Sequence, residues 1–217
     1  MSMCCSEYGG VAEVQFDARK AAEESARFQK KGPGSTTRLL RDGLMKAGFV
    51  EGVLLDIGAG VGALTFELLD HGISRAVAVD ASSSYLAVAA AEAARRGQTK
   101  HVQFVHGDFT TVAPRLPRAA IVTLDRVVCC YPLAEPLLSR AMGHAERALA
   151  LSYPRDVWYV RAVNAVENAR RRVAGKTFRT FAHSSSRMEQ FIRNAGFELF
   201  SRRETWTWSA DVYVRVR

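Results

Sequence analysis

One stretch decides the fold of this chain: Val53-Leu54-Leu55-Asp56-Ile57-Gly58-Ala59-Gly60-Val61-Gly62-Ala63-Leu64-Thr65. An apolar run ends in a carboxylate, glycines follow at every second position, and leucines at 64, 68 and 69 then repeat with helical spacing. This order predicts a buried parallel strand, a tight turn and the start of a helix. Glycine permits positive φ and lets a ligand approach the backbone, and the free N–H groups of the helix face the same point. We therefore expect a nucleotide or nucleoside site at the carboxyl end of this strand.

Strands and helices alternate along the rest of the chain, which predicts a parallel sheet with right-handed crossovers. Two closely spaced strands near the C-terminus predict an antiparallel hairpin at one edge. We predict an α/β fold, a Rossmann-like, seven-stranded, mostly parallel sheet with an antiparallel last strand and helices on both faces. The expected strands are 53–57, 76–80, 102–105, 119–124, 148–152, 198–203 and 205–216, and the expected helices are 62–69, 82–96, 133–147, 158–173 and 184–195.

The sequence indicates helices on both sides of this alternation. Residues 1–48 are expected to form an N-terminal helical cap, with one helix over 14–31 and another from Ser35 or Thr36 to Lys46. Residues 49–217 are expected to form the ligand-binding domain, in which 153–183 is a helical lid insertion after the fifth strand.

Composition bounds the class of protein. The 217 residues are 48% hydrophobic and 24% charged, which is typical of one globular domain. No apolar run reaches the roughly 18 residues of a membrane span, and the N-terminus does not resemble a signal peptide, so we expect a cytoplasmic protein without a membrane partner. The net charge is +8, but the arginines are scattered and not interleaved with aromatic residues. This favours a solvated basic surface, and nucleic acid is the less favoured partner.

The four cysteines form two adjacent pairs, Cys4-Cys5 and Cys129-Cys130. Neither pair has the C-x2-C spacing of a zinc site. We expect reduced thiols and no metal; a metal shared between the pairs is the weaker alternative.

The glycine spacing alone does not identify the nucleotide, because Gly58-x-Gly60-x-x-Ala63 also fits the dinucleotide fingerprint. Asp56 before the turn would repel a pyrophosphate and suits a ligand with an amine. Asp80 follows the second strand and suits a ribose diol.

The third strand is followed by Gly107-Asp108-Phe109, which offers a carboxylate for an adenine amine and an aromatic ring beside it. Together these features favour adenosine carrying an amino acid. The structural alternatives are a turn-stabilising role for Asp56, a helix cap for Asp80 and a core position for Phe109.

The chain resembles a class I S-adenosylmethionine-dependent methyltransferase over about residues 50–217. The motifs are Leu55–Gly62, Val77–Asp80, Val105–Phe109 and Ile121–Val127. The resemblance implies S-adenosylmethionine as cofactor, with S-adenosylhomocysteine as product. It also implies a set of cofactor-binding residues, namely Asp56, Gly58, Ala59 and Gly60 at the amino-acid end, Asp80 and Ala81 at the ribose, Asp108 and Phe109 at the adenine, and Leu124 beside the sulfonium.

The segments 125–132 and 151–155 are similar to those of a bacterial small-molecule subgroup, distantly similar to magnesium-protoporphyrin O-methyltransferases. This implies methyl transfer to a small-molecule acceptor by in-line displacement, in a monomer or homodimer. The alternatives are an RNA or protein methyltransferase, a non-methylating protein that binds the adenosyl cofactor, and a nicotinamide dehydrogenase.

Methyl transfer depends mainly on positioning, and a general base is needed only when the nucleophile arrives protonated. Asp125, Tyr131 and His183 are the candidate catalytic residues, although an ion pair with Arg126, loop packing and a structural histidine are the respective alternatives. The predicted lid insertion, 153–183, would bring further side chains to an aromatic or carboxylated substrate. The candidate substrate residues are Tyr153, Arg155 and Trp158.

Overall fold

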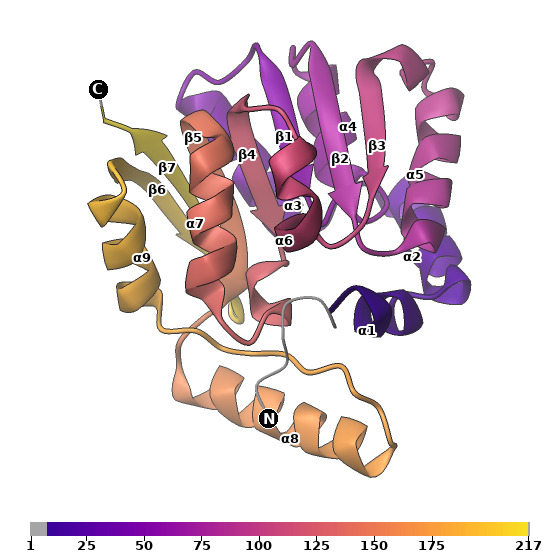
Figure 1. Cartoon of the computed structure of the whole chain (residues 1–217), viewed down its shortest axis with the longest axis vertical. Coiled ribbons are helices and arrows are strands. Elements are labelled where there is room, and N and C mark those ends of the chain that lie inside the picture. The colour runs from indigo at the N-terminus through magenta and orange to yellow at the C-terminus, as the bar shows by residue number, and fades with distance from the viewer. Residues whose placement is uncertain (1–7, 217) are drawn as a thin grey trace.

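One sheet organises the molecule in the computed structural model, which describes residues 8–216 (Figure 1). Its strand order is β3-β2-β1-β4-β5-β7-β6, and β7 alone runs in the direction opposite to the other strands. This confirms the predicted topology. The strands are β1 (Val53–Ile57), β2 (Arg75–Asp80), β3 (Val102–His106), β4 (Ala119–Asp125), β5 (Ala145–Pro154), β6 (Phe197–Glu204) and β7 (Trp208–Arg215).

Helices cover both faces of the sheet, and short 3-10 turns lie at Thr99–His101, Ala113–Arg115 and Val128–Cys130, the last of which is labelled η4. The described helices are α1 (Tyr8–Gln15), α2 (Ala18–Lys31), α3 (Ser35–Lys46), α4 (Ala63–Asp70), α5 (Ser83–Arg95), α6 (Phe109–Val112), α7 (Ala134–His144), α8 (Trp158–Val173) and α9 (Ser185–Asn194).

The two faces of the sheet have separate cores, because successive side chains of a strand point to opposite sides. In β1, Leu55 belongs to a core that also holds Leu137 of α7 and Ile192 of α9. The neighbouring Leu54 belongs to a second core, which holds Leu44 of α3. The central strands are buried on both sides, and this is why they read as continuous apolar runs.

The N-terminal helices differ from the prediction in one place. The single helix expected over 14–31 is divided into α1 and α2, because Asp17 has extended backbone and caps α2 by accepting a hydrogen bond from the N–H of Lys20 at 2.9 Å. The break turns Phe16 toward the carboxyl edge of the sheet, where it contacts Tyr85 and Phe178 edge to face. α1 therefore forms a separate wall beside the strand ends.

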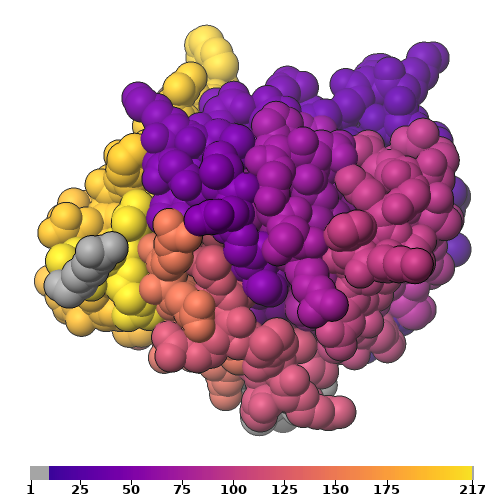
Figure 2. All heavy atoms as spheres, turned by 90° about the horizontal axis from the view of Figure 1, so that it is seen from above, coloured from indigo at the N-terminus to yellow at the C-terminus, as the bar shows by residue number. Residues whose placement is uncertain are grey.

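α3 is part of the main core, since Leu40 and Leu44 are fully buried and the helix packs on β7, β5 and β4. Seen from the amino end of the parallel strands, the violet N-terminal segment lies beside the yellow C-terminal hairpin (Figure 2).

The helix expected over 133–147 is shorter in the structure than in the prediction. It ends at His144, because residues 145–147 already belong to β5.

α8 lies beyond the carboxyl edge of the sheet and is joined to α9 by an extended segment (Figure 1). Val160 is its only buried residue. Among residues 8–216, no helix is long and apolar enough to cross a membrane.

Candidate functional site

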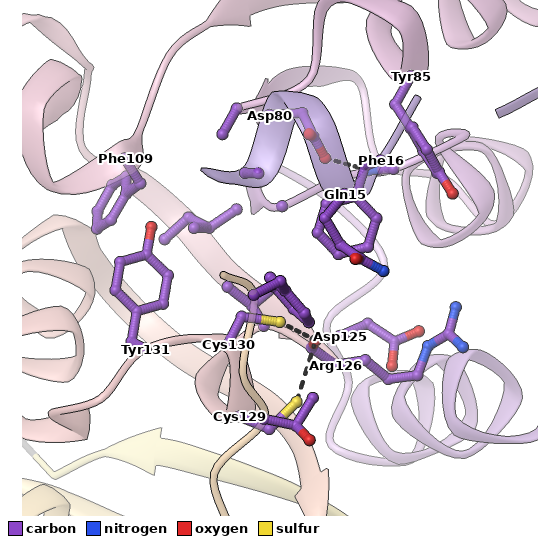
Figure 3. A pocket seen from close by; sticks show the side chains of 18 of the residues that line it. Gln15, Phe16, Asp80, Tyr85, Phe109, Asp125, Arg126, Cys129, Cys130 and Tyr131 are labelled. Carbon is purple, nitrogen blue, oxygen red and sulfur yellow. Dashed lines mark hydrogen bonds between the residues drawn. The ribbon is translucent and has the colours of Figure 1, made fainter. Parts of the chain in front are cut away.

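A cavity of about 280 Å³ lies at the carboxyl ends of the parallel strands (Figure 3). Its walls come from the ends of β1, β2 and β4, from α1, from η4 and from the segment after α8. The predicted residues that line it are Gly58, Gly60, Asp80, Ala81, Phe109, Asp125 and Tyr131. A smaller adjoining hollow of about 60 Å³ is shared with α2 and α3 and is lined by Asp56 and Ala59.

The glycine turn requires glycine. Gly58 has a φ of 65° and Gly60 a φ of 58°, and a Cβ on Gly58 would lie 2.4 Å from Cγ2 of Val127. The turn therefore keeps its backbone open toward the cavity.

Asp80 closes this turn from the neighbouring strand. Its Oδ2 accepts the N–H of Gly60 at 2.8 Å, and its Oδ1 accepts the N–H of Ser82 at 2.8 Å. Burial raises the pKa of Asp80, and the two backbone donors oppose that rise. Each carboxylate oxygen has a second acceptor position, so Asp80 can hold the turn and also accept from a diol in the cavity.

Asp108 stands at the end of β3 as the N-cap of α6. Its Oδ1 accepts the N–H of Thr110 at 2.9 Å and the hydroxyl of Tyr131 at 2.7 Å. Its Oδ2 is buried and has no hydrogen-bond partner among the described residues. A buried acceptor without a donor is costly, and the ring of Phe109, which lines the cavity, follows directly in the chain. Asp108 itself is not among the residues that line the cavity, so the ring of Phe109 is the member of this pair that borders it.

Asp56 lies behind the turn. It is 2% exposed, and its two oxygens accept the hydroxyls of Thr65 at 2.6 Å and Thr123 at 2.7 Å. Burial raises the pKa of Asp56 to about 6, despite these two hydrogen bonds. Asp56 therefore ties α4 to β4 as well as bordering the smaller hollow.

Asp125, at the end of β4, borders both hollows. Its Oδ1 accepts the hydroxyl of Ser152 at 2.5 Å and its Oδ2 that of Thr37 at 2.6 Å. Both oxygens are thereby fixed in direction. Arg126 follows with a φ of 61°, strained for a residue with a side chain, and its side chain reaches into the cavity wall (Figure 3).

Two predicted catalytic residues are placed in supporting positions. The hydroxyl of Tyr131 orients Asp108, and burial raises its pKa, which disfavours a role as general base. Nε2 of His183 donates to the carbonyl oxygens of Val128 and Tyr131, at 3.2 and 3.0 Å. Burial lowers the pKa of His183, and the residue lies outside the cavity lining.

The three residues predicted at the substrate do not line the cavity. Tyr153 is 2% exposed and donates to Oδ2 of Asp211 at 2.7 Å, because β5 continues through this position and turns the ring into the core. Arg155 pairs with Glu204 at 2.9 Å. Trp158 points to solvent and is 80% exposed. Leu124, predicted beside the sulfonium, is likewise buried in the core.

Other residues take these places in the cavity wall. The end of α1 contributes Gln15, the residue after it is Phe16, and the C-terminal part of the insertion contributes Arg171, Phe178 and Thr180. Phe16 could have been found from the sequence, because Phe16 and Phe28 are the two large apolar residues of the charged segment 14–31. The insertion offers no comparable signal, because Phe178 lies in irregular chain.

The side chains of Cys129 and Cys130 line the cavity, and each sulfur lies 3.6 Å from the carbonyl oxygen of Arg126 (Figure 3). A hydrogen bond with Cys130, together with burial, raises the pKa of Cys129. The other predicted pair, Cys4-Cys5, lies outside the described residues. Within residues 8–216, no group of three or more His, Cys, Asp and Glu side chains is arranged to hold a metal ion.

The sequence of residues 54–151 matches a family model described as a methyltransferase domain. No curated protein matches the chain significantly in sequence.

Solved structures share the fold across almost the whole chain. A magnesium protoporphyrin IX methyltransferase from Synechocystis PCC 6803 with bound SAH aligns with a TM-score of 0.73 and 18% identity, over 94% of this chain and 96% of that chain. An O-methyltransferase family protein from Burkholderia thailandensis aligns with a TM-score of 0.72 and 16% identity, over 94% and 62%. A putative RNA methyltransferase from Pyrococcus horikoshii aligns with a TM-score of 0.62 and 17% identity, over 86% and 87%. The resemblance to class I methyltransferases is confirmed at the level of domain and fold.

Proposed function

We propose that this chain, whose residues 54–151 match a methyltransferase domain, binds S-adenosylmethionine and transfers its methyl group to a small-molecule acceptor. The observation that carries the proposal is the unpartnered, buried Oδ2 of Asp108, which lies at the same edge of the sheet as Asp80 and the glycine turn. These groups offer one acceptor for an adenine amine, a carboxylate for a ribose diol and an open backbone for the amino-acid end.

The smaller hollow supports the last assignment. It holds Glu24 and Arg27 of α2 together with Asp56 and Arg126. Carboxylates and guanidinium groups around one hollow are complementary to an ammonium and a carboxylate on the ligand. The start of α3 also faces this hollow through Thr37, and helix N-termini favour anionic groups.

The cofactor, when bound, supplies an electrophilic methyl group. The residues of this chain position the reactants and exclude water. Asp125 is held rigidly by Ser152 and Thr37. Its carboxylate therefore has a fixed position beside the cavity and can orient a hydrogen-bond donor of the molecule that receives the methyl group. Phe16 and Phe178 pack edge to face on each other and line the same cavity. Catalysis would come chiefly from approach geometry.

Calorimetry tests the cofactor. Titration with S-adenosylhomocysteine should show binding and titration with NAD should not. Binding of NAD alone would contradict the proposal. Asp80→Ala should lose S-adenosylhomocysteine binding, whereas Asp70→Ala on the distant end of α4 is the matched control and should keep it.

The acceptor requires a second experiment. Release of S-adenosylhomocysteine should be stimulated by members of a panel of small aromatic and carboxylated molecules, and not by RNA or by protein. An RNA substrate is the alternative that the net charge of +8 favours. It would be recognised by RNA-stimulated turnover and by binding that weakens steeply with salt.

A further inference from the structure

The outer face of α8 carries an exposed apolar stripe. Trp158, Val166 and Val173 are 80%, 62% and 91% exposed, and Ala162 and Ala169 are also exposed. On a helix with about 3.6 residues per turn, these five positions follow one side. A soluble helix normally turns such a stripe toward the core, so this one has the opposite orientation.

The inner face of the same helix is already occupied. Val160 is buried, and the side chains of Asn168 and Arg171 bond to Thr180 of the following segment at 2.7 Å and 3.3 Å. The cavity therefore uses one side of α8, and the apolar stripe lies on the other.

A second exposed tryptophan extends the stripe at its N-terminal end. Trp206, in the turn between β6 and β7, is 85% exposed. Its carbonyl oxygen accepts the hydroxyl of Tyr159 at 2.7 Å, and the ring of Trp158 packs edge to face on Tyr159 at 5.8 Å. Two indole rings thus lie on the surface around one residue.

The charges around the stripe are mostly positive. Residues 156–179 contain six basic and two acidic side chains. The acids are already paired, Asp156 with Arg161 at 2.5 Å and Glu167 with Arg171 at 3.4 Å. The remaining basic side chains on the exposed surface have no acidic partner among the described residues, and they are Arg170, Arg172 and Lys176.

We propose that α8 and the turn that carries Trp206 dock on an anionic lipid surface, with the helix lying in the plane of the interface. An apolar stripe flanked by cations, with indole rings at one end, fits the boundary between headgroups and acyl chains. A second copy of the chain fits less well, because antiparallel α8 helices would bring the free cations against Asp156, which Arg161 already neutralises.

This proposal departs from the sequence-based expectation of no membrane partner. Docking of this kind needs no spanning helix, and it goes beyond the proposed methyl transfer without depending on it. The segment that binds lipid would be the same one that supplies Arg171 to the cavity wall, so the mouth of the cavity would open close to the lipid surface.

Vesicle flotation tests the proposal. The protein should float with vesicles of phosphatidylcholine containing about 30% phosphatidylglycerol at low salt, and only weakly with phosphatidylcholine alone. Val166→Glu and Val173→Glu should each weaken binding by about tenfold or more, because each places a carboxylate in the apolar stripe. Val50→Glu, at the amino end of the sheet and 43% exposed, is the matched control and should bind like the unaltered protein.

A second pair of variants avoids any effect of new acids on folding. Arg170→Gln together with Arg172→Gln should weaken anionic binding and flatten its salt dependence, and Arg118→Gln at the start of β4 should not. The melting temperature and the affinity for S-adenosylhomocysteine should stay unchanged in all these variants.

Four results would overturn the proposal: no flotation of the unaltered protein, equal flotation with neutral and anionic vesicles, undiminished binding by the stripe variants, or a dimer in sedimentation that the stripe variants dissociate. Because cofactor affinity is measured separately, failure of lipid binding leaves the proposed function intact, and loss of cofactor binding leaves the lipid result intact.

Discussion

The ends of the parallel strands and the helix α8 were both expected to border the cavity, and only the strand ends supply the predicted side chains. Asp80 pairs in register with His106 of β3, and Ile57 with Val79 of β2, so the residues that follow these strands converge without further contacts. α8 has no such constraint. Its rotation depends on which side packs inward, and Trp158 faces solvent as a result.

The largest effect is expected at Asp80, where one carboxylate serves both the turn and the ligand. Asp80→Ala should weaken S-adenosylhomocysteine binding by about 100-fold or more, since each hydrogen bond to a charged group contributes roughly 1.5–3 kcal/mol. Calorimetry measures this. A loss of less than threefold would break the assignment of the strand ends to the cofactor.

Asp56 separates direct contact from support of the scaffold. A carboxyl group whose pKa rises to about 6 on folding holds more protons in the native than in the unfolded state between about pH 4 and pH 6. Its contribution to the free energy of unfolding therefore falls as pH rises through that window, by up to about 3 kcal/mol. Asp56→Asn should remove this fall, as measured by urea unfolding from pH 4 to pH 8.

The same variant should keep S-adenosylhomocysteine affinity within about threefold if Asp56 acts by holding Thr65 and Thr123. A loss of about 30-fold would instead indicate direct contact with the ligand amine.

Two variants of one helix test its inner and outer sides. Arg171→Ala should raise the Michaelis constant for the acceptor by about tenfold, because Arg171 lines the cavity. Trp158→Ala should leave it within about twofold. The measurement is steady-state kinetics with the acceptor that the panel identifies. A larger rise of the Michaelis constant in Trp158→Ala than in Arg171→Ala would show that Trp158 contacts the substrate after all.

Tyr131 is expected to give the smallest effect on the cofactor side. Tyr131→Phe removes the hydrogen bond to the Asp108 carboxylate and leaves that carboxylate in place, so S-adenosylhomocysteine affinity should fall by about fivefold, or roughly 1 kcal/mol. The turnover number at saturating cofactor should be unchanged. A fall of about 100-fold in that number would show that Tyr131 is a general base after all.

The sequence predicted those features that follow from local pattern and from the geometry of a parallel sheet. The mostly parallel sheet with its antiparallel last strand, the glycine turn and the positions of Asp80 and Asp108 are of this kind. The hydrogen-bond partners of Asp108 and Asp125 were not predictable from the sequence. The hydrogen bond from Tyr131 to Asp108 and the one from Thr37 to Asp125 join distant parts of the chain.

Errors arose where an element extended further than its pattern suggested. Tyr153 was expected to follow the strand over 148–152 and to begin the lid insertion, but β5 continues to Pro154 and its alternation turns Tyr153 toward Asp211. The break between α1 and α2 at Asp17 was missed for a different reason. A capping aspartate within a charged segment does not stand out by composition.

The packing of α3 determines which residues belong to the cooperative folding unit. The segment that matches the methyltransferase family model begins at residue 54, yet Leu40 and Leu44 fill the space beneath β5 and β7. A chain trimmed to the matched segment would open that core to water and leave Asp125 without the hydroxyl of Thr37. Sequence similarity thus marks out less than a unit able to fold, and heat or urea should melt the N-terminal helices and the sheet in a single transition.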